Sequence, residues 1–296
     1  MRNVTDHQGA RTGRVMIDLP PNTSASQLVT YAMCGRLYFY RYVLHVEPEF
    51  RSLNLALGSA VHSSIGWWFQ EKLQGHQPTL DAAEKIFSAD IAAETVQMPI
   101  RWKNQTPDEL EAKGQALVRA YLSDYGDLPV VGVEQRFEVD IENSDTGEAL
   151  PRPLVGYFDL VVRKGDEIVE IKTTAKAWHP QSILRHLQVG SYVAAANTLH
   201  GGPARVVIHA ILKQRTPRVE EYPVERGEPD NAWFFHAAKS IESAIQAGHF
   251  PPSPGPTCIE CEFGKACLAE RGAVAPVSRL RKTNRIEQAS CMQLAI

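Results

Sequence analysis

Residues 131–173 carry the pattern that most restricts the fold of this chain. From Val131 to Ile141, apolar and charged side chains alternate, which is typical of a strand with one buried face. Two more strand-like segments follow at residues 154–163 and 168–173, and the short glycine-containing turn between them predicts a hairpin. Three strands in succession require a sheet, and other parts of the chain must cover it.

The segments on either side supply that cover. We expect helices at residues 28–42, 53–73, 81–96, 110–125, 180–199 and 230–247, and two further strands at 205–213 and 219–224. Thr106, Pro107 and Glu109 form a start signal for the helix at 110–125, with a capping hydroxyl, an early proline and an acid at the third position. These elements predict an α/β (α+β) fold in which helices flank a mixed sheet.

Composition limits the broad class of protein. The chain has 296 residues, of which 44 % are apolar, so it can bury a full core and is not generally disordered. Its formal net charge of −3 excludes a wholly basic nucleic-acid coat, although a local basic groove remains compatible with it. The N-terminus lacks the apolar core of a signal peptide, and no run of about 18 apolar residues occurs. We therefore expect a cytoplasmic protein that contacts no membrane.

The chain is expected to have five segments. A flexible N-terminus (1–20) precedes a helical region that carries Cys34 and His62 (21–128). A central core (129–250) is followed by a proline-rich bridge with a cysteine cluster segment (251–275) and a basic tail (276–296). Five cysteines are too few for a disulfide scaffold of this size, so we expect reduced thiols that are available to a metal.

The predicted hairpin carries a constellation of charged groups. Glu170 and Lys172 are two residues apart in a strand and project from the same face, while Ile171 points the other way. Pairing across the hairpin brings Asp159 beside them. Two close carboxylates repel each other unless a cation lies between them, and Mg²⁺ or Mn²⁺ takes such oxygen ligands. The alternative is an ordinary exposed ion pair on a strand face.

The order of these residues resembles a known family. Asp159 followed by Glu170-x-Lys172 on the next strand looks like the core motif of the PD-(D/E)XK nuclease superfamily. Gln188 and Tyr192, four residues apart on the following helix, match the Q-x-x-x-Y element of its RecB-like branch. His62 matches the upstream histidine of that branch. The resemblance implies a restriction-endonuclease-like core.

The same resemblance assigns roles to these side chains. It implies that His62, Asp159, Glu170 and the backbone carbonyl of Ile171 bind the divalent metal ion, and that Lys172 positions or activates the attacking water. Gln188 and Tyr192 would orient Lys172 and the DNA backbone. The alternative for His62 is a buried histidine of the core, and the alternative for Gln188 and Tyr192 is a packing pair. Glu134 lies on the polar face of its strand; it could join the site, but we expect it to face solvent.

Three cysteines lie close together near the C-terminal end. Cys258, Cys261 and Cys267 are one thiolate short of a four-ligand site, and either Cys34 or Cys291 could supply the fourth. A distant N-terminal cysteine with a C-terminal triplet resembles the layout of iron–sulfur members of the RecB-like nucleases, the CRISPR-associated exonuclease family and the AddB nuclease domain. The resemblance implies a structural 4Fe–4S cluster, and zinc is the alternative.

An arginine- and tyrosine-rich segment follows Cys34. Arg36 and Arg41 lie among Tyr38 and Tyr40, and such side chains can grip and stack single-stranded nucleic acid. The alternative is a packing patch over the metal cluster. Arg279, Arg281, Lys282 and Arg285 in the tail either contact DNA or belong to a solvated segment.

Together, the motifs predict a function by resemblance. We expect a Mg²⁺- or Mn²⁺-dependent DNA exonuclease that acts on single-stranded or frayed ends, with 5′→3′ polarity suggested by the CRISPR-associated branch. The alternatives are a non-catalytic DNA-end-binding module that serves recombination or repair, or a zinc-stabilised endonuclease. Recombination or replication proteins are possible partners, and relatives of this kind form oligomeric rings.

Overall fold

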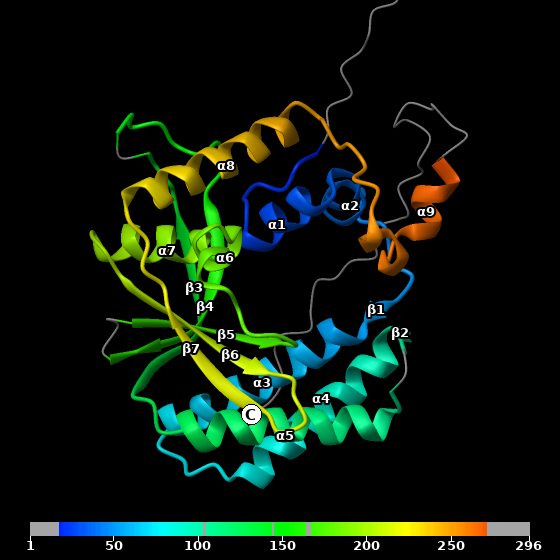
Figure 1. The fold of residues 1–296 in the computed structure, drawn as a ribbon, viewed down its shortest axis with the longest axis vertical. Helices are drawn as coiled ribbons and strands as arrows, with labels where there is room; N and C mark the ends of the chain where they lie inside the picture. The colour runs from blue at the N-terminus through cyan, green and yellow to red at the C-terminus, as the bar shows by residue number, and fades with distance from the viewer. Residues whose placement is uncertain (1–17, 103–104, 144, 164–166, 271–296) are drawn as a thin grey trace, which may run out of the picture.

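A computed structural model describes residues 18–102, 105–143, 145–163 and 167–270. The centre is a five-stranded sheet in the order β3-β4-β5-β6-β7, which comprises β3 (Val130–Val139), β4 (Leu154–Val162), β5 (Glu167–Thr174), β6 (Arg205–Leu212) and β7 (Arg218–Pro223). The pairs β3–β4, β4–β5 and β6–β7 are antiparallel, and β5–β6 is parallel. The mixed sheet expected from the sequence is therefore confirmed (Figure 1).

Helices cover both faces of this sheet. On one side lie α3 (Leu53–Leu73), α4 (Leu80–Gln97) and α5 (Pro107–Tyr125) (Figure 1). Their apolar side chains form one core cluster with Leu160, Val162, Val169, Ile171 and Ile211 of the strands. On the other side lie α1 (Ala25–Met33), α7 (Leu187–His200) and α8 (Glu228–Gln246), which enclose a second cluster. Burial of both faces explains why β6 is a nearly continuous apolar run.

Several predicted boundaries are confirmed. Helix α3 spans the expected residues, and α5 begins with a reciprocal capping box between Thr106 and Glu109. Helix α8 ends just before Gly248, whose φ of 73° is the left-handed conformation that glycine favours after a helix.

One predicted helix, at residues 180–199, is wrong as a single element. It is two helices, α6 (Pro180–Leu184) and α7, because His186 has an extended backbone and starts the second. The ring of His186 packs on Trp178, with ring centroids 5.0 Å apart. This break places Gln188 in the first turn of α7.

The two ends of the described chain meet beside the sheet. The α2 helix (Gly35–Tyr38) and the π-helical turn η1 (Phe39–Val43) follow α1, and they pack against residues that lie beyond α8. A side-chain carbon on Gly35 would lie 2.9 Å from Pro251, so only glycine permits this approach. The C-terminal part then forms η3 (Pro256–Glu260) and α9 (Gly264–Ala269), and both lie near α2 in Figure 1.

Two short strands complete the described elements. β1 (Arg51–Ser52) and β2 (Ile100–Arg101) pair in parallel next to the start of α3. No helix in the described ranges is long and apolar enough to span a membrane. Residues 1–17 of the expected N-terminal segment and the whole basic tail, with Cys291, lie outside the described residues.

Candidate active site

The site forms where two paired strands separate. β4 and β5 pair only from Val162–Glu167 to Leu160–Val169, and beyond this point the ladder ends. Asp159 follows on β4, and its Oδ2 accepts a hydrogen bond of 2.7 Å from the backbone N–H of Ile171. A side chain thus satisfies the N–H that the diverging partner strand leaves free. The divergence opens room for side chains between the two strands.

Asp159 and His62 form the first charged pair of the site. His62 lies on α3, and its Nδ1 is 3.5 Å from Oδ2 of Asp159. Burial alone would raise the pKa of Asp159, but the charge of His62, Lys172 and the Ile171 N–H hold it below its usual value. Burial lowers the pKa of His62, and Asp159 more than offsets this, so its pKa is raised. The pair therefore favours a carboxylate beside an imidazolium.

Glu170 and Lys172 form the second pair, on β5. The Lys172 ammonium makes an ion pair with Oε1 of Glu170, which is only 2 % exposed. Burial, together with the charge of Asp159, raises the pKa of Glu170 to about 8 despite the presence of Lys172. Burial lowers the pKa of Lys172, but the two carboxylates reverse this and keep it raised. The four groups thus form one closely interacting set.

The first turns of α7 support Glu170 from the other side. Gln188 Nε2 donates to Oε1 of Glu170 and to the hydroxyl of Tyr192, both at 3.2 Å. The Tyr192 ring lies edge-on to Phe137, with ring centroids 6.2 Å apart. Gln188 and Tyr192 therefore meet the site as their spacing predicts. Gln188 contacts Glu170, so any effect of this pair on Lys172 passes through that carboxylate.

One buried oxygen indicates whether a metal ion fits. Oε2 of Glu170 is buried and has no hydrogen-bond partner among the described residues. An unpaired buried carboxylate oxygen is costly, and a hard divalent cation is a suitable partner for it. In the described ranges, no three His, Cys, Asp or Glu side chains surround one point closely enough to hold a metal ion. The donor chemistry fits a divalent ion, and the full ligand set remains a prediction.

A cleft runs from this site along α3. Its volume is about 840 Å³, and His62, Lys172 and Thr173 line it together with residues of α3 and β3. Glu134 also lines it, contrary to the expectation that this side chain only faces solvent. Glu134 lies opposite Asp159, between the register pairs Val133–Leu160 and Gln135–Phe158, and its φ is 47°. Although the residue is exposed, burial of its carboxylate in the cleft and the charge of Asp159 raise its pKa.

The cysteine segment forms a separate group of potential ligands. Cys34, between α1 and α2, accepts a hydrogen bond from the backbone N–H of Ser253 at 3.4 Å, and the Cys258 thiol contacts Ser253 O at 3.9 Å. Burial raises the pKa of Cys261 and Cys267, and the charge of Cys34 adds to both shifts. Cys34 and Cys258 thus both contact Ser253, which brings the N-terminal cysteine to the C-terminal segment, and a shared ligand set stays a prediction. Four thiols of this kind suit either an iron–sulfur cluster or zinc.

The predicted stacking role of Tyr38 and Tyr40 is wrong. Their side chains are 0 % and 2 % exposed and pack in an aromatic cluster with Phe39, Phe250 and Phe263. Buried rings cannot stack on a nucleic-acid base from solution. Their burial agrees with the alternative interpretation, a packing patch.

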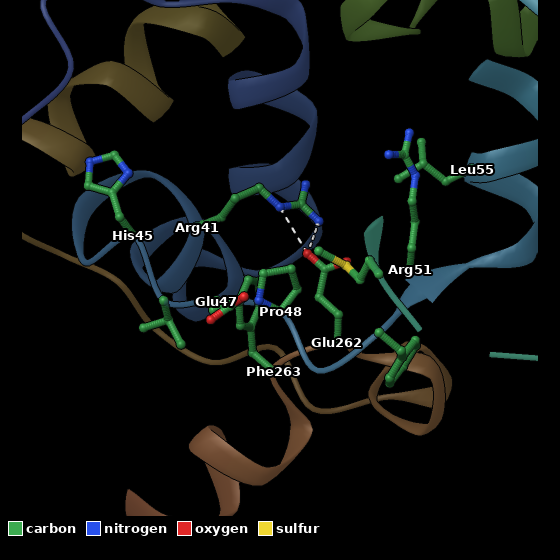
Figure 2. A pocket seen from close by; sticks show the side chains of 11 residues that line it. Arg41, His45, Glu47, Pro48, Arg51, Leu55, Glu262 and Phe263 are labelled. Atoms are coloured by element: carbon green, nitrogen blue, oxygen red, sulfur yellow. Dashed lines mark hydrogen bonds and ion pairs between the residues drawn. The ribbon is translucent and has the colours of Figure 1, made fainter. Parts of the chain in front are cut away.

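The two nearby arginines are paired with acids of the C-terminal segment. Arg36 lies 3.4 Å from Glu270, and Arg41 donates from Nε and one terminal nitrogen to Glu262 at 3.1 and 2.5 Å. Figure 2 shows Arg41 and Glu262 in a second cavity of about 610 Å³ between η1 and the cysteine segment. Leu55 lines both this cavity and the cleft along α3, so the two hollows adjoin. Contact of either arginine with DNA stays a prediction.

A sheet that opens at an Asp, Glu and Lys between two helical layers defines the class of hydrolytic nucleases with the restriction-endonuclease-like fold. The model of the PD-(D/E)XK nuclease superfamily matches residues 22–268, and the chain belongs to this superfamily. Nucleases of this superfamily generally use divalent metals such as Mg²⁺ or Mn²⁺.

Solved structures share the fold at low sequence identity. A candidate exonuclease from Eubacterium rectale is 14 % identical in sequence and has a TM-score of 0.53. The match covers 87 % of this chain and 91 % of the exonuclease chain. The protein SSO0001 is 13 % identical with a TM-score of 0.42, over 86 % of this chain and 89 % of its own. No curated protein sequence matches the chain. The likeness to the first structure supports the fold.

Proposed function

We propose that the protein is a metal-dependent deoxyribonuclease that degrades DNA from single-stranded or frayed ends. The observation that carries the proposal is the grouping of Asp159, Glu170 and Lys172 where β4 and β5 diverge, with Lys172 and the neighbouring His62 lining a cleft. Retention of all three side chains disfavours a module that only binds DNA ends. The name of the Eubacterium rectale structure, a candidate exonuclease, supports attack from ends.

His62, Asp159, Glu170 and the carbonyl of Ile171 would hold Mg²⁺ or Mn²⁺, and such an ion stabilises negative charge on a phosphate and lowers the pKa of a bound water. The Lys172 ammonium, beside Glu170, would orient the attacking water and stabilise charge on the phosphate. Gln188 holds Glu170 in place through its 3.2 Å hydrogen bond. This division of roles follows the family resemblance.

The four cysteines would hold a 4Fe–4S cluster, with zinc as the alternative. The role that we propose for this group is structural, because it would join Cys34 to a segment more than two hundred residues later in the chain. Closure of so long a loop restricts the unfolded chain. The 5′→3′ polarity rests on the resemblance to the CRISPR-associated branch alone.

The function is tested with end-labelled DNA. Anaerobically purified protein is incubated with single- and double-stranded DNA that carries the label at the 5′ or the 3′ end, with EDTA, Mg²⁺ or Mn²⁺. We expect metal-dependent loss of single-stranded DNA, with mononucleotides or short oligonucleotides released first from the 5′ end. Internal cuts in circular single-stranded DNA would contradict the exonuclease assignment, and intact DNA under all conditions would contradict the nuclease assignment.

A further inference from the structure

Helix α3 presents two parallel rows of residues to the cleft. Gly58, His62, Gly66 and Gln70 form one row at intervals of four, and Leu55, Ser59, Ser63 and Trp67 form the other. His62 belongs to the first row and lies in the charged site. Trp67 is five residues further along, which is about 7.5 Å along the helix axis. An aromatic ring therefore borders the same cleft close to the proposed reaction centre.

Two adjacent tryptophans occupy different environments. Trp68 donates from its indole N–H to the carbonyl of Gly126 at 3.0 Å and thereby ties α3 to the end of α5. Trp67 hydrogen-bonds to no described residue, is half-buried against the first core cluster, and lines the cleft. The hydrogen bond gives Trp68 a structural role. Packing buries only part of Trp67, and this residue lines the cleft.

The surroundings of Trp67 keep the cleft open. Gly66 faces Val133 of β3, and a side-chain carbon on Gly66 would lie 3.6 Å from the nearest Val133 methyl group. A longer side chain at Gly66 would fill the space between α3 and β3 on the way from His62 to Gln70. Polar groups at Ser63 and Gln70 flank the ring along the helix, and both residues are exposed. The result is a flat apolar surface with polar neighbours.

We propose that Trp67 is a stacking platform for one base of the DNA strand whose phosphate lies at Asp159 and Lys172. A purine or pyrimidine fits because every base has an apolar face, and stacking on aromatic rings makes no demand on sequence. An internal base of a duplex has both faces covered by its neighbours, so this subsite favours single-stranded or frayed DNA. The inference rests on the proposed nuclease function and names the form of substrate that the same cleft takes.

Binding is measured without hydrolysis. Fluorescence anisotropy in EDTA gives the Kd of a labelled oligothymidylate and of an abasic oligonucleotide of equal length, for the wild type and for Trp67→Leu and Trp67→Phe. Leucine keeps apolar volume without a ring, and phenylalanine keeps a ring. Trp233→Leu is the matched control, because Trp233 lies on α8 and is 39 % exposed. Thermal melting of each variant reports on its fold.

We expect Trp67→Leu to weaken binding of oligothymidylate by roughly 5- to 150-fold, the range for one stacked base. Binding of the abasic strand should stay within about twofold, and Trp67→Phe should keep most of the affinity. Equal losses for both strands, or no loss in Trp67→Leu, would overturn the platform. If the wild type cleaves DNA with Mn²⁺ but binds the abasic strand as tightly as oligothymidylate, this inference alone is refuted. Base-dependent binding without any cleavage would refute only the nuclease assignment.

Discussion

At the scale of single residues, the charge of the site is divided between two unlike carboxyl groups. His62, Lys172 and the Ile171 N–H keep the pKa of Asp159 low, while burial and Asp159 raise that of Glu170 to about 8. The free Oε2 of Glu170 is the strongest indication in the described residues that a cation belongs there. A bound cation would favour the charged form of Glu170.

Loss of Lys172 should remove catalysis and spare the fold. We expect Lys172→Ala to lower the Mn²⁺-dependent cleavage rate by at least about 100-fold, because one electrostatic partner of the developing charge is lost. Lys176→Ala is the matched control, since Lys176 is exposed and lies four residues further along. Initial rates on labelled single-stranded DNA measure both variants. A rate in Lys172→Ala equal to that of the control would contradict the assigned role.

Residue spacing predicted the main site better than it predicted its margins. The period of a strand is enough to place Glu170 and Lys172 together, and the structure brings Asp159 and Gln188 to them. Glu134 was expected to face solvent because alternation alone does not show that its strand bends at a φ of 47° beside Asp159. Tyr38 and Tyr40 were misassigned because composition cannot tell an inward ring from an outward one.

At the scale of elements, the contact between α5 and β6 contains a titratable group away from the site. His209 of β6 is 2 % exposed, and its Nδ1 lies 3.0 Å from the Tyr121 hydroxyl. Burial lowers the pKa of His209 to about 4 from an ordinary value of 6.5, although Glu221 opposes the shift. The ring is therefore neutral at pH 7, and its 3.8 Å contact with Glu221 is not an ion pair there.

The sign of the pH effect follows from this depressed pKa. The fold favours neutral His209, so its contribution is constant above about pH 6.5 and stability is lost as the pH falls toward 4. The loss is of order 3 kcal/mol at most. We expect His209→Gln to unfold with a shallower dependence on pH between 6.5 and 4 than the wild type. Urea unfolding measures this, with exposed His236→Gln as control, and parallel curves for His209→Gln and wild type would refute it.

A buried ion pair ties the loop before β4 to α8. Arg152 donates two hydrogen bonds to Glu242, at 2.7 and 2.8 Å, and the two side chains are only 8 % and 0 % exposed. A third bond from Arg152 reaches the carbonyl of Pro20 at 2.8 Å. The pair thus holds the start of the described chain against the sheet and α8.

Removal of one partner should cost much more than removal of both. We expect Arg152→Met to lower the free energy of unfolding by about 3–5 kcal/mol, because Glu242 is left buried without its partner. The double variant Arg152→Met/Glu242→Leu should recover much of this loss. Lys239→Ala, which breaks the surface pair with Glu148, should cost less than about 1 kcal/mol. Equal unfolding midpoints for Arg152→Met and Lys239→Ala would refute the expectation.

Element types were predictable to different degrees. The strands and the long helix α3 follow from hydrophobic period, and the capping box fixed the start of α5. Residues 180–199 divide into α6 and α7 at His186, whose ring packs on Trp178. The sequence pattern does not predict this contact. Tertiary contacts decide such breaks.

At the scale of the whole molecule, the cysteine segment connects the ends of the described chain around the nuclease core. Cys34 and Cys258 contact the same residue, Ser253, from opposite ends of the sequence. The sequence pattern indicated Cys34 as a fourth ligand, but proximity could be shown only by the fold. The competing Cys291 lies outside the described residues.

Loss of one proposed cluster ligand should loosen this connection. We expect Cys258→Ser to lose the visible absorption and the iron content of the anaerobically purified protein and to melt at a lower temperature. Each kcal/mol of lost stability lowers Tm by about 2–4 °C in a domain of this size. Cys291→Ser is the control and should keep both properties. Bound zinc with no visible absorption in the wild type would show the alternative metal, and iron retained by Cys258→Ser would refute its role as a ligand.

The most direct test of the nuclease site is the cleavage rate of Asp159→Asn with Mn²⁺. Asparagine has nearly the same shape and can still accept the Ile171 N–H, so this variant removes charge while keeping the local fold. We predict a loss of at least about 100-fold in the rate on labelled single-stranded DNA, and no loss in Asp124→Asn on the exposed surface of α5. Wild-type cleavage by a folded Asp159→Asn protein would contradict the assignment of the active site.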